Sequence, residues 1–202
     1  MIKNIIFDIG NVLVQFRPLE VMKELGMDED TVKAVAEATV QSPLWKELDR
    51  GVIPEDTVIE MMKQTTTGKY KDDVQRFFAE GSPLLVKSFD YSASWLQSCK
   101  QKGYHIFLLS NYPVRLFEMH SKSSFTFMPY IDGKIVSGYV KLIKPDAGIY
   151  ELLLKQYSLV PQECVFIDDV QENIEGAEKA GIRGIHFTNI QDVRNSLQAI
   201  IA

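Results

Sequence analysis

Polar side chains that can bind a metal ion follow apolar runs at separate places in this 202-residue sequence. Asp8 comes directly after NIIF, Ser110 and Asn111 close the run YHIFLLSN, and Asp168 and Asp169 complete CVFIDD. Carboxylates that meet in one crevice repel one another and raise each other's pKa unless a cation neutralises them. Carboxylate and carbonyl oxygens suit Mg²⁺, which typically shares its site with a substrate phosphate. The sequence therefore predicts a hard divalent cation beside Asp8.

Lys144 and two stretches of backbone provide what a phosphate group needs. Lys144 supplies a positive point charge, and Ser110 supplies a hydroxyl donor. The backbone N–H groups that follow Asp8 and Ser110 complete an anion-binding nest. Each residue alone also has a simpler interpretation, because Asp8 suits a turn before Gly-Asn, Ser110 suits a helix N-cap and Lys144 suits an exposed surface.

The elements that must position these residues are predicted from alternating strand and helix patterns. Short β-branched runs each precede a longer segment in which apolar residues return at three- and four-residue steps. That alternation predicts an α/β fold with a doubly wound parallel sheet, whose ligands bind beyond the carboxyl ends of the strands. The predicted strands are 4–9, 104–110, 164–169 and 183–187, and the clearest predicted helices are 91–102, 146–157 and 171–180.

Between the first and second predicted strands the pattern changes to helices alone. Residues 17–83 contain no strand-like run, and their segments LEVMKELG, EDTVKAVAEATV, PEDTVIEMMKQ and KDDVQRFFAE are amphipathic at helical spacing. We therefore predict a helical cap domain over 17–83, inserted into an α/β core domain made of 1–16 and 84–202.

With these motifs in order, the chain resembles the haloacid dehalogenase-like superfamily, and within it the phosphatases that carry a helical cap after the first motif. The motifs are FDIGNVL (7–13), LLSN (108–111), Lys144-Pro145 and FIDDVQENIEGA (166–177). The resemblance implies a Rossmann-like core and Mg²⁺-dependent hydrolysis of a small phosphorylated metabolite. Asp-apolar-Gly-Asn-Val is similar to the first motif of a sugar-phosphate (glucose-1-phosphate) phosphatase subgroup, so a sugar phosphate is the expected substrate.

The resemblance also implies a role for each matched residue. Asp8 would be the nucleophile that becomes an aspartyl-phosphate, a form of covalent catalysis open to carboxylates. Ser110, Asn111 and Lys144 would hold the phosphoryl oxygens, and Asn173 would order the last motif by hydrogen bonding. The implied Mg²⁺ ligands are Asp8, the backbone carbonyl of Gly10, Asp169 and, directly or through water, Asp168.

Gly10 departs from the family pattern, because most of its phosphatases carry a second Asp two residues after the nucleophile. That Asp is their general acid and base. A glycine supplies the backbone carbonyl but no proton donor, and general acid–base assistance is worth about 10²–10⁴-fold in rate. In the cap, WKELDRG (45–51) resembles a helix-turn that faces the active site. Asp49 or Arg50 is therefore expected to contact the substrate, unless both are solvated charges at a helix end.

Two other functions stay open because of Gly10. Metal-independent 2-haloacid dehalogenases of the family also lack the second Asp, although the acidic pair Asp168-Asp169 argues against their chemistry. A non-catalytic protein that binds phosphorylated metabolites is the other possibility. The joint presence of Asp8 and Lys144 with the remaining motifs argues against such a decayed site.

The composition is typical of an ordinary globular protein with a small-molecule ligand. A formal net charge of −5 argues against a nucleic-acid partner, because phosphate backbones favour clustered Lys and Arg. No apolar run is long enough to cross a bilayer, and the N-terminus lacks the pattern of a signal peptide. Two distant cysteines, Cys99 and Cys164, favour a reducing compartment, so the expected location is the cytoplasm. The sequence does not indicate the oligomeric state.

Overall fold

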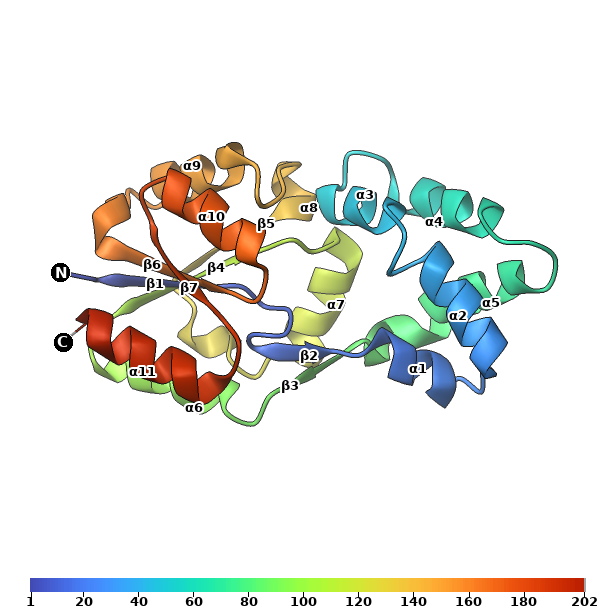
Figure 1. Ribbon diagram of the computed structural model, residues 1–202, viewed down its shortest axis with the longest axis horizontal. Helices are drawn as coiled ribbons and strands as arrows, with labels where there is room; N and C mark the ends of the chain where they lie inside the picture. Colours follow the sequence, from blue (N-terminus) through green and yellow to red (C-terminus); the bar gives the residue numbers. More distant parts are fainter. Residues whose placement is uncertain (202) are drawn as a thin grey trace.

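A five-stranded parallel sheet forms the centre of the computed structural model, which describes residues 1–201 (Figure 1). The strand order is β5-β4-β1-β6-β7, so the first strand of the chain lies in the middle. β1 pairs with β4 and β6, and Phe7 is level with Leu108 and Ile167. The predicted α/β fold with inserted helices is confirmed. The strands are β1 (Asn4–Phe7), β4 (His105–Ser110), β5 (Gly133–Val136), β6 (Cys164–Asp168) and β7 (Arg183–His186).

Apolar side chains on both faces explain why these segments form a buried parallel sheet. Neighbouring residues of a strand point to opposite faces, so Ile6 packs in one cluster whereas Ile5 and Phe7 pack in the other. Helices α9 and α10 cover the first face, and α6 and α11 cover the second (Figure 1). The core helices are α6 (Ser92–Gln101), α7 (Val114–Ser123), α8 (Ser137–Val140), α9 (Ala147–Gln156), α10 (Gln171–Lys179) and α11 (Ile190–Ile201).

The inserted helices are joined to the core by two short strands. The chain leaves through β2 (Val14–Phe16) and returns through β3 (Val86–Ser88), and these two strands pair in antiparallel fashion. Neither strand was expected from the sequence. We call residues 17–83 the helical insert; its limits stay a prediction, and its helices lie together at one end of the molecule (Figure 1). They are α1 (Pro18–Glu24), α2 (Glu29–Ala38), α3 (Leu44–Arg50), α4 (Glu55–Gln64) and α5 (Tyr70–Arg76).

The end of α3 rests against α8 of the core. Gly51 ends α3 in the left-handed conformation that glycine adopts without strain, with a φ of +66°. A Cβ atom at Gly51 would lie 2.9 Å from the Gly138 carbonyl oxygen, so the two backbones approach closely. The Ser137 hydroxyl donates to the Asp49 carbonyl, and the Lys141 ammonium donates to the Gly51 carbonyl. The C-terminal end of α3 is therefore fixed against the core.

Gly138→Ala is expected to disturb the packing of α8 against the loop between β4 and α7 and to lower stability. Its Cβ would lie 2.8 Å from the Tyr112 carbonyl oxygen and 2.9 Å from the Val114 nitrogen, so the backbone must shift. Overpacking of this kind costs about 1–3 kcal/mol, and each kcal/mol lowers the melting temperature of a chain this long by roughly 2–4 °C. In Gly148→Ala, the control, the new Cβ would meet only the Leu142 side chain at 3.5 Å. Equal melting temperatures for the two variants would contradict the close packing.

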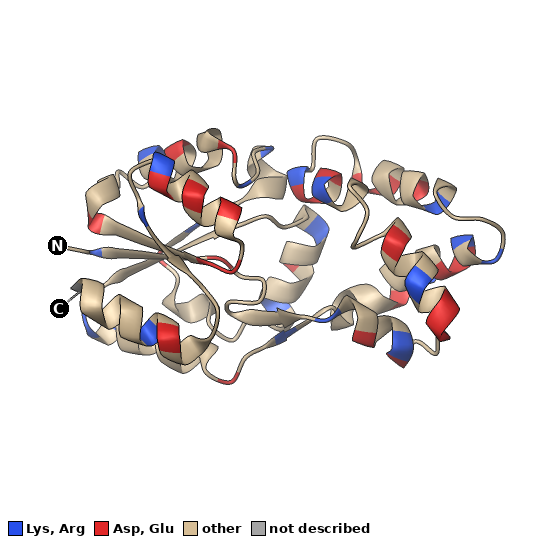
Figure 2. Cartoon of the chain, viewed as in Figure 1, with Lys and Arg blue, Asp and Glu red and all other residues tan. Residues whose placement is uncertain are grey.

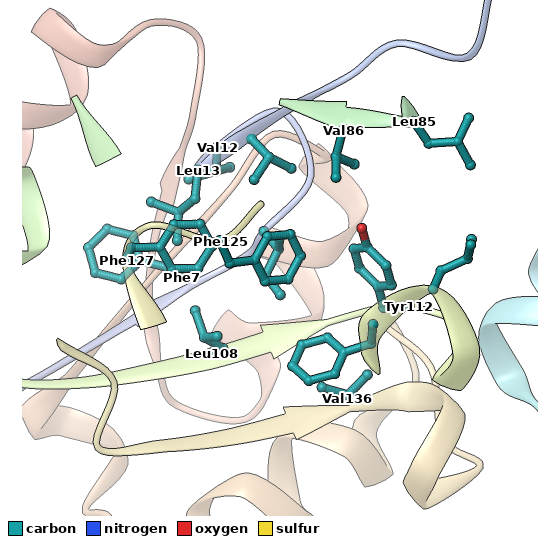
Figure 3. Packing of buried hydrophobic residues seen from close by; sticks show 14 of the residues in the cluster. Phe7, Val12, Leu13, Leu85, Val86, Leu108, Tyr112, Phe125, Phe127 and Val136 are labelled. Carbon is teal, nitrogen blue, oxygen red and sulfur yellow. The ribbon is translucent and has the colours of Figure 1, made fainter. Parts of the chain in front are cut away.

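A cluster of aromatic and aliphatic side chains supports the carboxyl ends of the strands. Phe7 of β1, Leu108 of β4 and Val136 of β5 belong to it together with Phe125 (Figure 3). Tyr112, which follows β4, lies in the same cluster, and its hydroxyl points away from Val136 toward β3 (Figure 3). The packing thus ties the ends of the central strands to the strand on which the chain returns from the insert.

The surface charges are mixed over the helices. Lys and Arg lie interspersed with Asp and Glu on both the core and the insert (Figure 2). This distribution differs from the clustered basic face that nucleic acids attract. Within residues 1–201, no helix combines the length and the apolar character needed to span a membrane.

Candidate active site

Three carboxylates meet at the carboxyl edge of the sheet. Asp8 follows β1, Asp168 ends β6 and Asp169 follows it, and one oxygen of each lies within 4.8 Å of the others. Burial is the largest cause that raises the pKa of Asp8, to about 6; Lys144 opposes this shift, whereas Asp168 and Asp169 add to it. Burial also raises the pKa of Asp169. The cluster therefore resists carrying its full negative charge without a further cation.

Lys144 is buried within this cluster. Its Nζ lies 2.6 Å from Asp168 Oδ2 and 2.8 Å from Asp8 Oδ1. Burial lowers the pKa of Lys144, but the charges of Asp8 and Asp168 outweigh burial and raise this pKa above its ordinary value. Even so, Asp8 Oδ1 receives no well-aligned hydrogen bond from the residues described. Beyond its ion pair with Lys144, this buried carboxylate oxygen keeps lone pairs that an external ligand can use.

Donors occupy both oxygens of Asp168. Asn173 Nδ2 lies 3.0 Å from Oδ1 and 3.1 Å from Oδ2, and the Val170 N–H donates to Oδ1 at 2.8 Å. Lys144 adds its bond to Oδ2 at 2.6 Å. These contacts leave little free capacity for a metal ion, so they favour an indirect or water-mediated role for Asp168. They also place Asn173 where it can order the loop before α10.

The turn after Asp8 shapes the other side of the cluster. Asn11 has a φ of +51°, a left-handed conformation that Asn adopts more readily than most residues. Its Nδ2 donates to Asp169 Oδ2 at 3.1 Å. The Gly10 carbonyl accepts from the Val12 N–H at 2.7 Å and keeps a second lone pair. A Cβ at Gly10 would find Asp8 Oδ2 at 4.0 Å as its nearest neighbour, so the position has room for a side chain.

Ser110 and Asn111, at the end of β4, have different hydrogen-bonding surroundings. Ser110 is buried and lines the cavity beside Asp8, and its hydroxyl has no hydrogen-bond partner among residues 1–201. The Asn111 side chain instead holds Lys144 in place, because it accepts from the Lys144 N–H at 2.8 Å and donates to the Lys144 carbonyl at 3.0 Å. Its amide is thus occupied by the protein, which leaves the Asn111 backbone N–H as the group available to a phosphate.

A cavity of about 260 Å³ opens beside Asp8. Its polar wall contains the predicted residues Asp8, Gly10, Asp49, Ser110, Asn111, Lys144, Asp169 and Asn173. Its apolar wall comes from β2, α3, the start of β3 and α7, through Val14, Phe16, Trp45, Leu85, Val86 and Leu116. A second cavity of about 870 Å³ lies between α3 and the loops before α9 and α10, and it shares Trp45, Asp49, Asn111, Lys144, Val170 and Asn173 with the first.

Asp49 and Arg50 occupy different surroundings although they are neighbours on α3. Asp49 lines both cavities, and burial, followed by the charge of Asp8, raises its pKa to about 8 against the attraction of Lys144. Arg50 lines only the second cavity, where it lies 3.7 Å from Asp146 and 3.9 Å from Glu47. The first cavity therefore brings Asp49, but not Arg50, together with Asp8.

Several residues at the site were not singled out in the sequence. Asn11 could have been found, since an Asn after a Gly in a turn suits a left-handed backbone and can turn its amide to a neighbouring loop. Trp45 and Phe16 could not, because an aromatic residue on an insert or a short edge strand fits packing equally well. Tyr112 and His120 form a hydrogen-bonded pair of 2.7 Å that only the fold brings together.

The donor set fits a hard divalent cation. Carboxylate oxygens of Asp8 and Asp169 and the second lone pair of the Gly10 carbonyl are oxygen donors of the kind that Mg²⁺ prefers. The raised pKa values of Asp8 and Asp169 agree with this, because a nearby cation stabilises the charged form of a carboxyl group.

Comparison with known proteins places this geometry in context. Residues 2–181 match the model of the haloacid dehalogenase-like hydrolases. The chain is 28% identical over 192 residues to a sesquiterpene phosphatase of Aspergillus oryzae, covering 93% of the chain and 90% of the relative. It is 26% identical over 215 residues to a D-ribitol-5-phosphate phosphatase of Bacteroides thetaiotaomicron, covering 100% and 99%. A crystal structure of an enzyme of the same family from that bacterium, in complex with magnesium and inorganic phosphate, superposes with a TM-score of 0.67 at 23% identity, covering 92% and 94%.

Proposed function

Since the chain belongs to the haloacid dehalogenase-like hydrolases, we propose that it is a Mg²⁺-dependent phosphatase of small phosphorylated metabolites. The observation that carries this proposal is the convergence of Asp8, Asp169 and Lys144 on one cavity at the carboxyl edge of the sheet. Two phosphatases among its relatives, and the magnesium and phosphate bound by a protein of similar fold, support it.

In the proposed reaction, Asp8 is the nucleophile. One of its oxygens attacks phosphorus, the bond to the ester oxygen breaks, and an aspartyl-phosphate forms. Lys144, the Ser110 hydroxyl and the Asn111 backbone N–H hold the phosphoryl oxygens, which gather negative charge as the bond breaks. A Mg²⁺ bound by Asp8, the Gly10 carbonyl and Asp169 would neutralise phosphate charge and align it for in-line attack. Asn173 and Asp168 keep Lys144 and the acidic loop in position.

The polar and apolar walls of the cavity suggest two classes of phosphate ester, which differ in their alcohol part. The family motif and the ribitol-phosphate relative favour a sugar or polyol phosphate. The apolar wall, with Phe16, Trp45 and Leu116, favours an alcohol that presents carbon surface, as the sesquiterpene relative would suggest. We retain a sugar phosphate as the first candidate and a prenyl monophosphate as the second.

Phosphate release from a panel of esters tests the proposal. Protein stripped with EDTA should release no phosphate above background from sugar phosphates, polyol phosphates or prenyl monophosphates, and added Mg²⁺ should restore release from at least one of them. A preference of tenfold or more in kcat/KM for prenyl over sugar esters would select the second candidate.

The same panel separates the other two functions. Turnover that survives EDTA, or halide release from a 2-haloacid without metal, would contradict the phosphatase and favour the dehalogenase. Tight binding of phosphate esters without turnover, in the presence of Mg²⁺, would instead identify a binding protein.

A further inference from the structure

We propose that Asp49, on α3 of the helical insert, is the general acid and base of this site and takes the part that Gly10 cannot play. The inference rests on the proposed phosphatase function. The helical insert would then take part in proton transfer as well as in substrate selection.

The position of Asp49 supports this role. Its side chain lines the same cavity as Asp8, Ser110 and Lys144, and it also lines the adjoining larger cavity. Among residues 1–201, no hydrogen bond or ion pair joins its carboxyl group to another side chain. The contact of Gly51 with Gly138 and the bond from Ser137 to the Asp49 carbonyl hold this end of α3 on the core. Asp49 is therefore free to act on a molecule in the cavity.

The surroundings of Asp49 favour its protonated form. Burial and the charge of Asp8 raise its pKa to about 8, although Lys144 acts in the opposite direction. A neutral carboxyl group can donate a proton, and donors with a pKa near the working pH are the most effective. Asp8 and Lys144 act on its charge, and its own charge acts on Tyr112. Glu47 and Arg50 lie beside it on α3, and Lys141 at the end of α8 binds the Gly51 carbonyl two residues further along the chain.

The other titratable side chains of the cavity are already occupied. The backbone carbonyl of Ser82 accepts from His120 Nε2 at 2.7 Å, so Nδ1 must accept from the Tyr112 hydroxyl. Both groups are thus bonded to each other or to the core. Lys144 is paired with two carboxylates, and Asp169 belongs to the proposed metal site. Asp49 is the acid that remains.

The proposed proton transfers balance over the two half-reactions. Asp8 Oδ bonds to phosphorus while the ester P–O bond breaks; the departing oxygen keeps the electron pair, takes the proton of Asp49 and leaves as an alcohol. Asp49 is then a carboxylate. It next accepts a proton from the water whose oxygen attacks phosphorus, the bond from phosphorus to Asp8 breaks, and inorganic phosphate, the Asp8 carboxylate and protonated Asp49 result.

Esters that differ in leaving group test the proposal. For an alkyl ester, whose oxygen needs a proton, Asp49→Asn should lower kcat by about 10²–10⁴-fold. For p-nitrophenyl phosphate, the p-nitrophenolate leaves without a proton. The loss in the rate of its burst phase, in which the aspartyl-phosphate forms, should therefore be at least tenfold smaller. Asp56→Asn, an exposed carboxyl on α4 that lines neither cavity, is the matched control. Asp49→Ser repeats the test if Asp49→Asn melts below the unmodified protein.

A rescue variant separates proton transfer from a structural role. Because Gly10 has room for a side chain, Gly10→Asp should restore alkyl-ester turnover to Asp49→Asn by tenfold or more, whereas Gly10→Asn should not. The fall of kcat at alkaline pH that deprotonation of Asp49 causes in the unmodified protein should disappear in Asp49→Asn.

Three results would overturn the inference. The first is an equal loss on both esters, the second is no loss on either, and the third is no rescue by Gly10→Asp. If the unmodified protein hydrolyses neither ester with Mg²⁺, the proposed function fails, and this inference fails with it.

Discussion

Asp8→Asn is expected to abolish phosphate release, lowering kcat on the order of 10⁴-fold or more, because an amide cannot form the phosphorylated intermediate. Acid quenching during turnover of a ³²P-labelled ester should trap label on the unmodified protein and none on Asp8→Asn. The variant should still fold, since the two side chains have nearly the same shape. Asn also removes a negative charge at a position where burial raises the pKa of Asp8 to about 6.

Asp90→Asn is the matched control for this experiment. Asp90 is exposed before α6 and lines neither cavity at the site, so its loss should leave kcat within about twofold. If Asp8→Asn retained a tenth of the activity, or if label still appeared on the protein, covalent catalysis by Asp8 would be refuted. A large fall in its melting temperature would mean that Asp8 acts mainly in folding.

Lys144→Met is expected to harm both stability and catalysis. The substitution leaves Asp8 and Asp168 as buried carboxylates without their shared cation, and breaking a buried ion pair from one side costs about 3–5 kcal/mol. Turnover should fall about 10²–10³-fold, the usual effect of removing one preorganised group that stabilises transition-state charge. Urea unfolding in EDTA measures the first effect, and kcat with saturating Mg²⁺ measures the second.

Lys100→Met provides the comparison for this variant. Lys100 pairs with Asp132 at 2.7 Å, but both side chains are about one-third exposed, so the pair should contribute no more than about 1 kcal/mol. A stability loss for Lys144→Met no larger than that of Lys100→Met would show that the buried cluster does not depend on this cation.

The fold and the positions of Asp8, Ser110 and Asp168 at the sheet edge could be predicted because local patterns determine them. Continuous apolar runs such as NIIF and CVFI are typical of strands buried on both faces of a parallel sheet, and the polar residue after each run then lies at the carboxyl edge. Asp8, Ser110 and Asp168 follow this rule. β2 and β3 were missed because three-residue strands are too short to show a period, and β5 was missed because its sequence GKIV holds only two apolar residues.

The helical insert shows where sequence reasoning stops. Asp49 and Arg50 are adjacent acidic and basic residues at a helix end, and only the docking of α3 on α8 decides which one lines the cavity beside Asp8. Asn111 illustrates the same limit, because its motif suggests contact with phosphate while its side chain is bonded to both backbone groups of Lys144. Long-range contacts of this kind leave no local pattern in the sequence.

The two short strands that join the insert to the core also affect how the substrate preference of such a protein can change in evolution. The chain passes between the core and the insert only through β2 and β3, which are paired with each other. Lengthening, shortening or replacing the segment between them leaves the register of the five-stranded sheet unchanged. Under the proposed function, new substrate preferences can therefore arise by descent without rebuilding the proposed phosphate site, provided that the close contact between Gly51 and Gly138 is inherited.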